Sequence, residues 1–240
     1  MNTEAHLEFY RRWHRLNAPY FRWQFEQFER FLGDRCADIG CGIGNFLPCF
    51  LDRGFYLGID NDPELVIELQ NQLPDHDGFR ALRVDATTPA MAEVLRSFSI
   101  DSAICVNVLE HISEDRLVVG NLIDALPVGG TLSILVPALP FLFGTLDTLD
   151  GHYRRYTKST LRELWTGLDV RVERLHYFNF VAIPGWYLKG RILKDTRQTD
   201  ANYKLMNILL PAVRAAERLV HPPIGLSLVA VLRKTSRVSI

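Results

Sequence analysis

The feature that most constrains the fold is the glycine-rich stretch CADIGCGIGN at residues 36–45. A short apolar run ends in an acid, and glycines then occupy three alternate positions, Gly40, Gly42 and Gly44. Glycine accepts positive φ and leaves no Cβ in the way of a ligand. We expect a strand, a tight turn and a helix that begins near Asn45, so that backbone N–H groups and the positive helix end face a cofactor.

The spacing of the glycines bears on which cofactor binds. The dinucleotide fingerprint needs a third glycine five residues after the first, where this chain has Asn45. Asp38 would repel a pyrophosphate, but it suits a cationic ligand such as the amino group of a methionine moiety. The stretch resembles motif I, D-x-G-x-G-x-G, of the class I S-adenosylmethionine-dependent methyltransferases.

Polar residues also follow the next strand-like runs. Asp60 closes the run 55–60, Asp85 follows 79–84, and Asn107 lies near the end of 99–108. Strands alternating with helices predict a doubly wound parallel sheet, which binds ligands beyond the carboxyl ends of its strands. We expect Asp60 to accept hydrogen bonds from ribose hydroxyls, while Asp62 caps the following helix.

Two further motifs extend the resemblance to the family. NVLEHI at 107–112 matches its motif IV, N-x-L-E-H-[IV], and LPVGGTL at 126–132 matches L-P-x-G-G-x-L before the fifth strand. The resemblance implies S-adenosylmethionine as cofactor, S-adenosylhomocysteine as product, and an α/β fold with a seven-stranded, mostly parallel sheet and an antiparallel last strand. It implies adenine binding at Asp85. The cofactor contacts expected in this core are Asp38, Gly40, Cys41, Gly42, Gly44, Asn45, Asp60, Asn61, Asp85, Ala86, Asn107 and Val108.

We expect four segments along the chain: a helical cap at 1–34, the cofactor-binding core at 35–178, a helical hydrophobic insertion at 179–225, and the last strand with a tail at 226–240. In the cap, Pro19 is expected in the first turn of an amphipathic helix. Tyr20 and Arg22 are candidates to close over the cofactor or the acceptor. The alternative is a covering helix with solvated arginines.

The acceptor side is expected at the loop 137–156, which ends in GHYRRY. Methylation of a hydroxyl needs a group to take its proton, and His111 and His152 are the candidate catalytic residues. For His111 a structural hydrogen bond at the helix start is an equal alternative. Tyr153, Arg154, Arg155 and Tyr156 are expected to bind the acceptor, the arginines suiting a phosphate or carboxylate.

No metal site is expected. Some relatives bind a divalent ion through E-x-x-E-H and a later histidine, but Asn107 replaces the first acid here. That leaves Glu110, His111 and His152, fewer oxygen ligands than hard cations prefer.

Composition narrows the partners and the location. A net charge of -1 argues against a nucleic-acid binder. The N-terminus lacks an apolar signal-peptide core, no apolar run approaches a membrane span, and the four cysteines lack paired metal-type spacing. We therefore expect a cytoplasmic protein with reduced thiols, a monomer or homodimer. Residues 179–225 are expected either to contact the inner membrane surface peripherally or to pack on the core or in a dimer contact.

The expected function is O-methylation of a small-molecule, saccharide or lipid-linked acceptor. GHYRRY and the closing PPIGLSL resemble a methyltransferase group whose bacterial members are associated with cell-surface saccharide or lipid-linked pathways. The alternative is a cofactor-binding scaffold at a membrane surface without catalysis. A nicotinamide dehydrogenase is disfavoured by Asn45.

Overall fold

The structure, a computed structural model, describes residues 3–194, 199–220 and 222–236. Residues 195–198 and 221 of the expected insertion, and 237–240 of the expected tail, lie outside the described residues.

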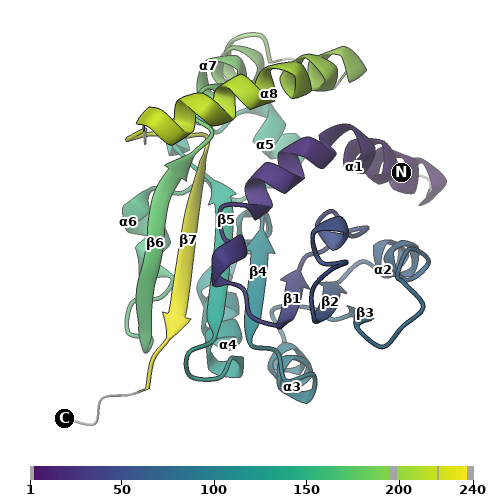
Figure 1. Cartoon of the computed structure of the whole chain (residues 1–240). Coiled ribbons are helices and arrows are strands. Elements are labelled where there is room, and N and C mark those ends of the chain that lie inside the picture. The colour runs from purple at the N-terminus through teal and green to yellow at the C-terminus, as the bar shows by residue number, and fades with distance from the viewer. Residues whose placement is uncertain (1–2, 195–198, 221, 237–240) are drawn as a thin grey trace.

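A seven-stranded sheet forms the centre of the protein (Figure 1), with the order β3-β2-β1-β4-β5-β7-β6. The first five strands pair in parallel, and β7 runs antiparallel to both of its neighbours, β5 and β6. The expected fold class and its antiparallel last strand are therefore confirmed. The strands are β1 (Arg35–Ile39), β2 (Phe55–Asp60), β3 (Phe79–Arg83), β4 (Ser102–Val106), β5 (Thr131–Pro137), β6 (Val170–Phe178) and β7 (Ser227–Lys234).

The helices cover both faces of this sheet. The α-helices are α1 (Thr3–Phe25), α2 (Pro63–Gln70), α3 (Ala90–Ser97), α4 (Asp115–Ala125), α5 (Thr145–Leu149), α6 (Lys158–Glu163), α7 (Ala182–Tyr187) and α8 (Asp200–Val220). Short 3₁₀ turns are η1 (Glu29–Phe31), η2 (Leu47–Cys49), η3 (Leu109–His111) and η4 (Pro140–Leu142), and η5 (Leu188–Ile192) is a π-helix.

Two local expectations were wrong. The glycine turn leads into the three-residue η2, which ends at Cys49, and not into a full helix. Pro19 lies inside α1, which begins at Thr3, so the proline does not mark a first turn. The ion pair between Arg11 and Glu68 of α2, with two N–H···O distances of 2.8 Å, helps to hold α1 in place.

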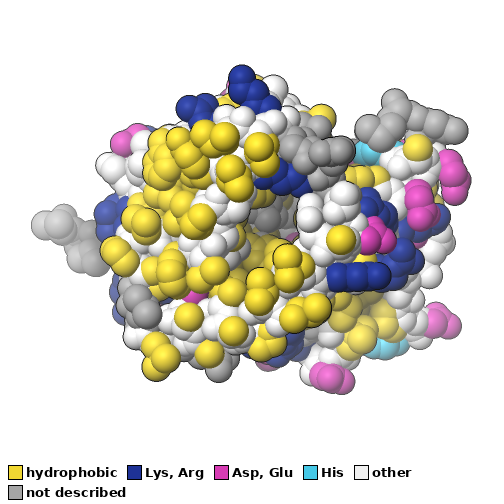
Figure 2. All heavy atoms as spheres, turned by 90° about the horizontal axis from the view of Figure 1, so that it is seen from above, with side chains coloured by type: hydrophobic (Ala, Val, Ile, Leu, Met, Phe, Trp, Pro, Cys, Tyr) yellow, Lys and Arg dark blue, Asp and Glu magenta, His cyan; other side chains and the backbone are white. Residues whose placement is uncertain are grey.

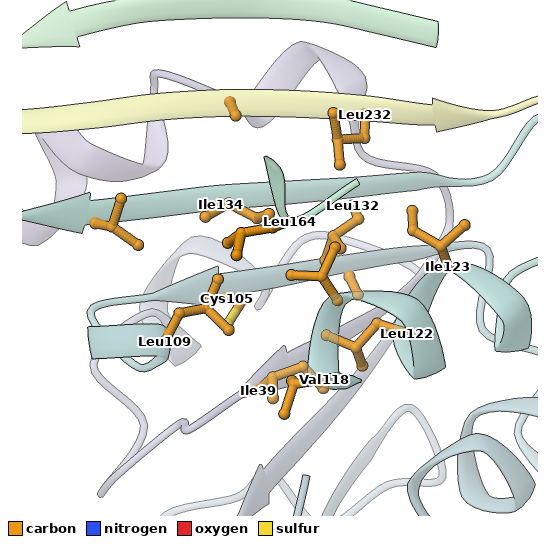
Figure 3. Close-up of a cluster of buried hydrophobic side chains, with 14 of the residues drawn as sticks. Ile39, Cys105, Leu109, Val118, Leu122, Ile123, Leu132, Ile134, Leu164 and Leu232 are labelled. Atoms are coloured by element: carbon orange, nitrogen blue, oxygen red, sulfur yellow. The ribbon is translucent and has the colours of Figure 1, made fainter. Parts of the chain in front are cut away.

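Alternate residues of the buried strands point to opposite faces of the sheet, where they form two separate hydrophobic cores. On β4, Ala103 and Cys105 join a cluster with α3, α4 and α6, whereas Ile104 and Val106 face the aromatic residues of α1. Figure 3 shows part of the first cluster, in which Val118 and Leu122 of α4 lie close to the strands. Both faces are thus sealed, which leaves the strand ends as the place for a ligand.

The segment between β6 and β7 leaves the sheet and returns to the same point. The N–H of Leu226 donates to the carbonyl of Asn179 over 3.2 Å, and a Cβ on Gly225 would lie 2.5 Å from the carbonyl oxygen of Phe178. Between these closed ends, α7, η5 and α8 form the top of the molecule in Figure 1.

Two leucines of α4 test this account of the core. Leu122 is fully buried, whereas Leu117 is 51% exposed on the same helix. Leu122→Ala should lower the free energy of unfolding by about 2–5 kcal/mol because it opens a cavity. Leu117→Ala, the matched control, should change it by about 0.5 kcal/mol or less. Urea unfolding followed by circular dichroism measures both, and equal losses would contradict the packing described.

Candidate active site

The glycine turn follows β1 at the carboxyl edge of the sheet. Its glycines have φ of +71° at Gly40, +56° at Gly42 and +89° at Gly44. A Cβ on Gly40 would lie 2.3 Å from Val108 Cγ2, and one on Gly44 would lie 2.6 Å from Leu69 Cδ1. A Cβ on Gly42 would meet only the Asn45 amide nitrogen, at 3.7 Å. Packing therefore requires Gly40 and Gly44, while Gly42 borders space that a ligand can enter.

Several N–H groups of the turn are already used inside the protein. Gly40 and Cys41 donate to the carbonyl of Ile59 over 2.7 and 3.0 Å, and Gly42 donates to Asp60 Oδ2 over 2.9 Å. These bonds fix the turn to the end of β2. Because η2 is so short, the helix end expected to face the cofactor is replaced by this rigid, close-fitting turn.

Two acids stand beside the turn. Asp38 is buried, and burial raises its pKa to about 7, with the Tyr56 hydroxyl donating to Oδ2 over 3.1 Å. A carboxyl in this setting is stabilised in its charged form by a cationic ligand. Asp60 is half-buried, and its Oδ1 accepts from the N–H of Asp62 over 3.0 Å. Asp62 caps α2 as expected, since its Oδ1 accepts from Glu64 N over 2.9 Å.

A hollow of about 340 Å³ lies next to the ends of β2 and β3, lined by Asn61, Arg83, Val84 and Asp85. The Asp85 carboxylate accepts hydrogen bonds from the Thr87 hydroxyl over 2.7 Å and from the Thr87 backbone N–H over 2.9 Å. These bonds lower the pKa of Asp85. The structure thus brings Asn61 and Asp85, both expected to contact the cofactor, to one hollow. Ala86 is half-buried beside them.

One face of α1 lies against this edge through residues that the sequence reading missed. His6 Nε2 lies 3.3 Å from Asp62 Oδ2, and His14 Nδ1 lies 3.1 Å from Asn45 Oδ1. Tyr10, between them, is mostly buried, and burial together with nearby carboxylates raises its pKa; those carboxylates are Asp60, Asp62 and Asp150. The sequence could have indicated this face, because His6, Tyr10 and His14 are four residues apart and so lie on one side of a helix.

Tyr20 and Arg22 lie elsewhere. The Asn179 side-chain amide donates to the Tyr20 hydroxyl over 3.2 Å, and the Tyr20 ring lies against Trp23 and Phe178. Arg22 pairs with Glu26 and Glu29. These contacts leave the cofactor role expected for both residues without support.

The end of β4 meets the glycine turn. Asn107 has φ of +54°, and its N–H donates to the carbonyl of Leu135 over 2.8 Å. The next residue, Val108, packs over Gly40, and η3 then places Glu110 and His111. Residues of motif IV therefore lie directly beside the turn, as its match predicts.

Glu110, His111 and His152 form a cluster on this side. One ligand atom from each lies within 4.8 Å of the others, and the two imidazole rings are 4.6 Å apart at 84°. Burial raises the pKa of Glu110 to about 8. Partial burial and the neighbouring His152 lower the pKa of His111 to about 4, while the residue as a whole is exposed.

Asp147 of α5 orients this cluster, and the sequence reading missed it. Its buried carboxylate accepts from His152 Nδ1 over 3.0 Å, from Arg155 Nε over 2.6 Å and from Gly144 N over 2.9 Å. The bond fixes the His152 ring and leaves Nε2 as its other nitrogen. The loop contains two acids before His152, Asp147 and Asp150, and the fold of α5 brings Asp147 to the histidine.

Most of the residues expected to bind the acceptor are engaged with other groups of the protein. Arg155 is buried on Asp147, and its guanidinium lies 4.9 Å from the Trp186 ring centre. Arg154 pairs with Asp115 at 2.9 Å, and the buried Tyr156 hydroxyl donates to the same carboxylate over 2.7 Å. Tyr153 is 62% exposed. The structure therefore gives Arg155 and Tyr156 a supporting role in place of direct acceptor contact.

Comparisons with known proteins agree with this geometry. Residues 37–132 match the family model described as a methyltransferase domain, while no curated protein sequence matches the chain significantly. A methyltransferase dependent on S-adenosylmethionine from Mesorhizobium loti is 17% identical, with a TM-score of 0.59 over 88% of this chain and 97% of that one.

Two other solved structures share the fold. A methyltransferase dependent on the same compound from Archaeoglobus fulgidus is 16% identical, with a TM-score of 0.58 over 90% of this chain and 94% of that one. The N-methyltransferase NodS from Bradyrhizobium japonicum, solved with S-adenosylhomocysteine, is 14% identical, with a TM-score of 0.55 over 90% and 87%. Residues 37–132 therefore match a methyltransferase domain, and the strand order of the whole sheet agrees with the fold of these solved methyltransferases.

Proposed function

We propose that the protein transfers the methyl group of S-adenosylmethionine to a hydroxyl of a small-molecule, saccharide or lipid-linked acceptor. The observation that carries this proposal is the packing of Val108 on Gly40, which sets the cluster of Glu110, His111 and His152 beside the cofactor turn. Donor and acceptor are thereby held next to each other, and alignment of this kind can supply much of the rate acceleration.

The residues present fit the cofactor. Gly42 borders open space, the buried Asp38 pairs with the Tyr56 hydroxyl and with no cation of the described residues, and Asn61 and Asp85 line a hollow. In the proposal Asp38 faces the amino group, Asp60 the ribose hydroxyls and Asp85 the adenine amine. The cofactor supplies an electrophilic methyl group, and the chain supplies its position.

His111 and His152 are the proposed catalytic residues, placed to receive the acceptor hydroxyl. Asp147 is a positioning residue, because it holds His152 Nδ1 and leaves the other ring nitrogen for the acceptor side. The exposed Tyr153 is the remaining candidate for direct acceptor contact in GHYRRY. A non-catalytic scaffold has no use for a buried carboxylate that orients a histidine, so the cluster favours catalysis.

The proposed acceptor class is supported by the surface that η5 forms next to α5. Thr145 Oγ1 of α5 donates to the carbonyl of Gly190 over 3.0 Å, which joins η5 to the element that carries Asp147. Figure 2, which looks down on the top of the molecule in Figure 1, shows hydrophobic side chains gathered there with basic side chains at the border. Exposed members of this surface are Tyr187, Leu188, Ile192, Leu193, Leu205, Ile208 and Leu209.

Charge favours an anionic lipid surface as the partner of these side chains. Residues 175–194 contain Lys189, Arg191 and Lys194 and no acid. Aliphatic and tyrosine side chains beside basic ones suit the boundary between headgroups and acyl chains. Within the described residues, no helix combines the length and apolar character needed to cross a bilayer. We propose peripheral binding and a lipid-linked acceptor. Trp186 takes no direct part, because it packs on Arg155.

Cofactor binding is tested at Asp60. Asp60→Ala should weaken S-adenosylmethionine binding by about 1–3 kcal/mol, because the ribose hydroxyls lose their acceptor. Isothermal titration calorimetry measures the loss, and Asp77→Ala, at a fully exposed side chain, is the control. Since Asp60 also holds the glycine turn, circular dichroism must show a folded variant. Unchanged affinity would remove the ribose assignment.

The acceptor side is tested at His152. His152→Ala should lower methyl transfer by about 10²–10⁴-fold while S-adenosylmethionine affinity stays near that of the wild type. Transfer of labelled methyl into fractionated lipid and saccharide extracts provides the assay. His76→Ala, in the exposed loop before β3, is the matched control. Wild-type transfer by His152→Ala would contradict the assignment.

The lipid surface is tested by co-sedimentation with vesicles that contain anionic phospholipid. The wild type should sediment with them, and a Leu188→Ser, Ile192→Ser variant should remain in solution. A Leu51→Ser, Ile67→Ser variant removes side chains of similar exposure (50% and 55%, against 51% and 58%) from the turn after η2 and from α2, and it should behave as the wild type. If the wild type ignores the vesicles, the membrane proposal is wrong.

A further inference from the structure

The cluster of Glu110, His111 and His152 contains a buried carboxylate without a partner. Glu110 is 1% exposed, and neither Oε1 nor Oε2 has a hydrogen-bond partner among the described residues. A buried carboxylate left in this way costs free energy unless a cation or donor completes its surroundings. The nearest groups with free ligand capacity are the imidazoles of His111 and His152, which lie within 4.8 Å.

One of the two imidazoles is held from behind, since His152 Nδ1 bonds to Asp147 Oδ1 over 3.0 Å. Histidines that bind metal ions almost always donate their other N–H to a carboxylate or a carbonyl, which fixes the ring and makes the facing nitrogen a better ligand. Asp147 is itself neutralised by Arg155, so the supporting layer is complete without using Glu110.

We propose that Glu110, His111 and His152 bind one divalent first-row transition-metal ion, represented by Zn²⁺, on the acceptor side of the site. Two imidazoles and one carboxylate are a ligand set that such ions favour and that leaves coordination positions open. The expectation of no metal rested on the needs of hard, oxygen-binding cations, and those needs do not apply to this ion class.

The inference rests on the proposed function and gives the histidines a more specific role in it. An ion at this place would bind the acceptor oxygen and lower the pKa of its hydroxyl. The hydroxyl proton would leave to solvent, the oxygen would form the new bond to the methyl carbon, and the sulfur would keep the electron pair of the broken bond. His111 and His152 would then act as ligands of the ion.

The test measures binding of Zn²⁺ alone to the full chain after treatment with chelator and dialysis. Calorimetry should show one tight equivalent. Glu110→Gln, which preserves the side-chain shape, and His152→Ala should each weaken it by about 100-fold or more, and Asp147→Asn by about 10- to 100-fold. His76→Ala should bind as the wild type.

Two controls keep the result decisive. All proteins carry Cys49→Ser, because Cys49 is the cysteine that is not fully buried and could bind zinc itself. S-adenosylmethionine affinity near that of the wild type shows that each variant is folded. Equal zinc affinity in Glu110→Gln, His152→Ala and the parent would overturn the site, as would the lack of tight binding in the parent.

The measurement uses neither an acceptor nor turnover, so it separates the two proposals. Methyl transfer by a protein that binds no zinc would leave the proposed function standing and remove the metal site. Zinc binding without methyl transfer to any extract would leave the metal site standing and contradict the proposed function.

Discussion

The close packing of Val108 on Gly40 is the contact on which the site depends. It joins the turn after β1 to the segment after β4. These two strands are neighbours in the sheet, and the order in which the chain adds strands reverses between them. Any side chain at position 40 would force these segments apart, and φ of +71° further favours glycine there. The cofactor turn and the histidine cluster are therefore neighbours because a single Cβ is missing.

A second constraint is the carboxylate of Asp147. It is buried, yet it is satisfied by a guanidinium, an imidazole and a backbone amide. Disturbing such a network costs stability, because loss of one partner leaves an unpaired charge inside the protein, where the dielectric constant is low. Asp147 therefore links the fold of the loop 137–156 to the orientation of His152. Glu110, by contrast, has a buried carboxylate whose needs the described chain does not meet.

Much of the core could be predicted from the sequence because its signals are local. The run ending in Asp60 gave β2 with its observed bounds, and Asp62-Pro63 marked the start of α2. Predictions failed where distant contacts decide the outcome. Pro19 is a local helix breaker, yet α1 continues through it while packed on α2 and α8. Likewise, only the three-dimensional course of α5 selects Asp147 over Asp150.

The closed ends of the segment between β6 and β7 carry an evolutionary consequence. Asn179 and Leu226 are hydrogen-bonded to each other at the ends of β6 and β7. The pairing of these two strands therefore does not depend on the length of the segment between them. Doubling the length of such an excursion costs only about 0.6 kcal/mol in closure entropy. The excursion can therefore grow in length without disturbing the pairing of β6 with β7, whereas α8 itself stays tied to the N-terminal helix through Arg12 and Asp200.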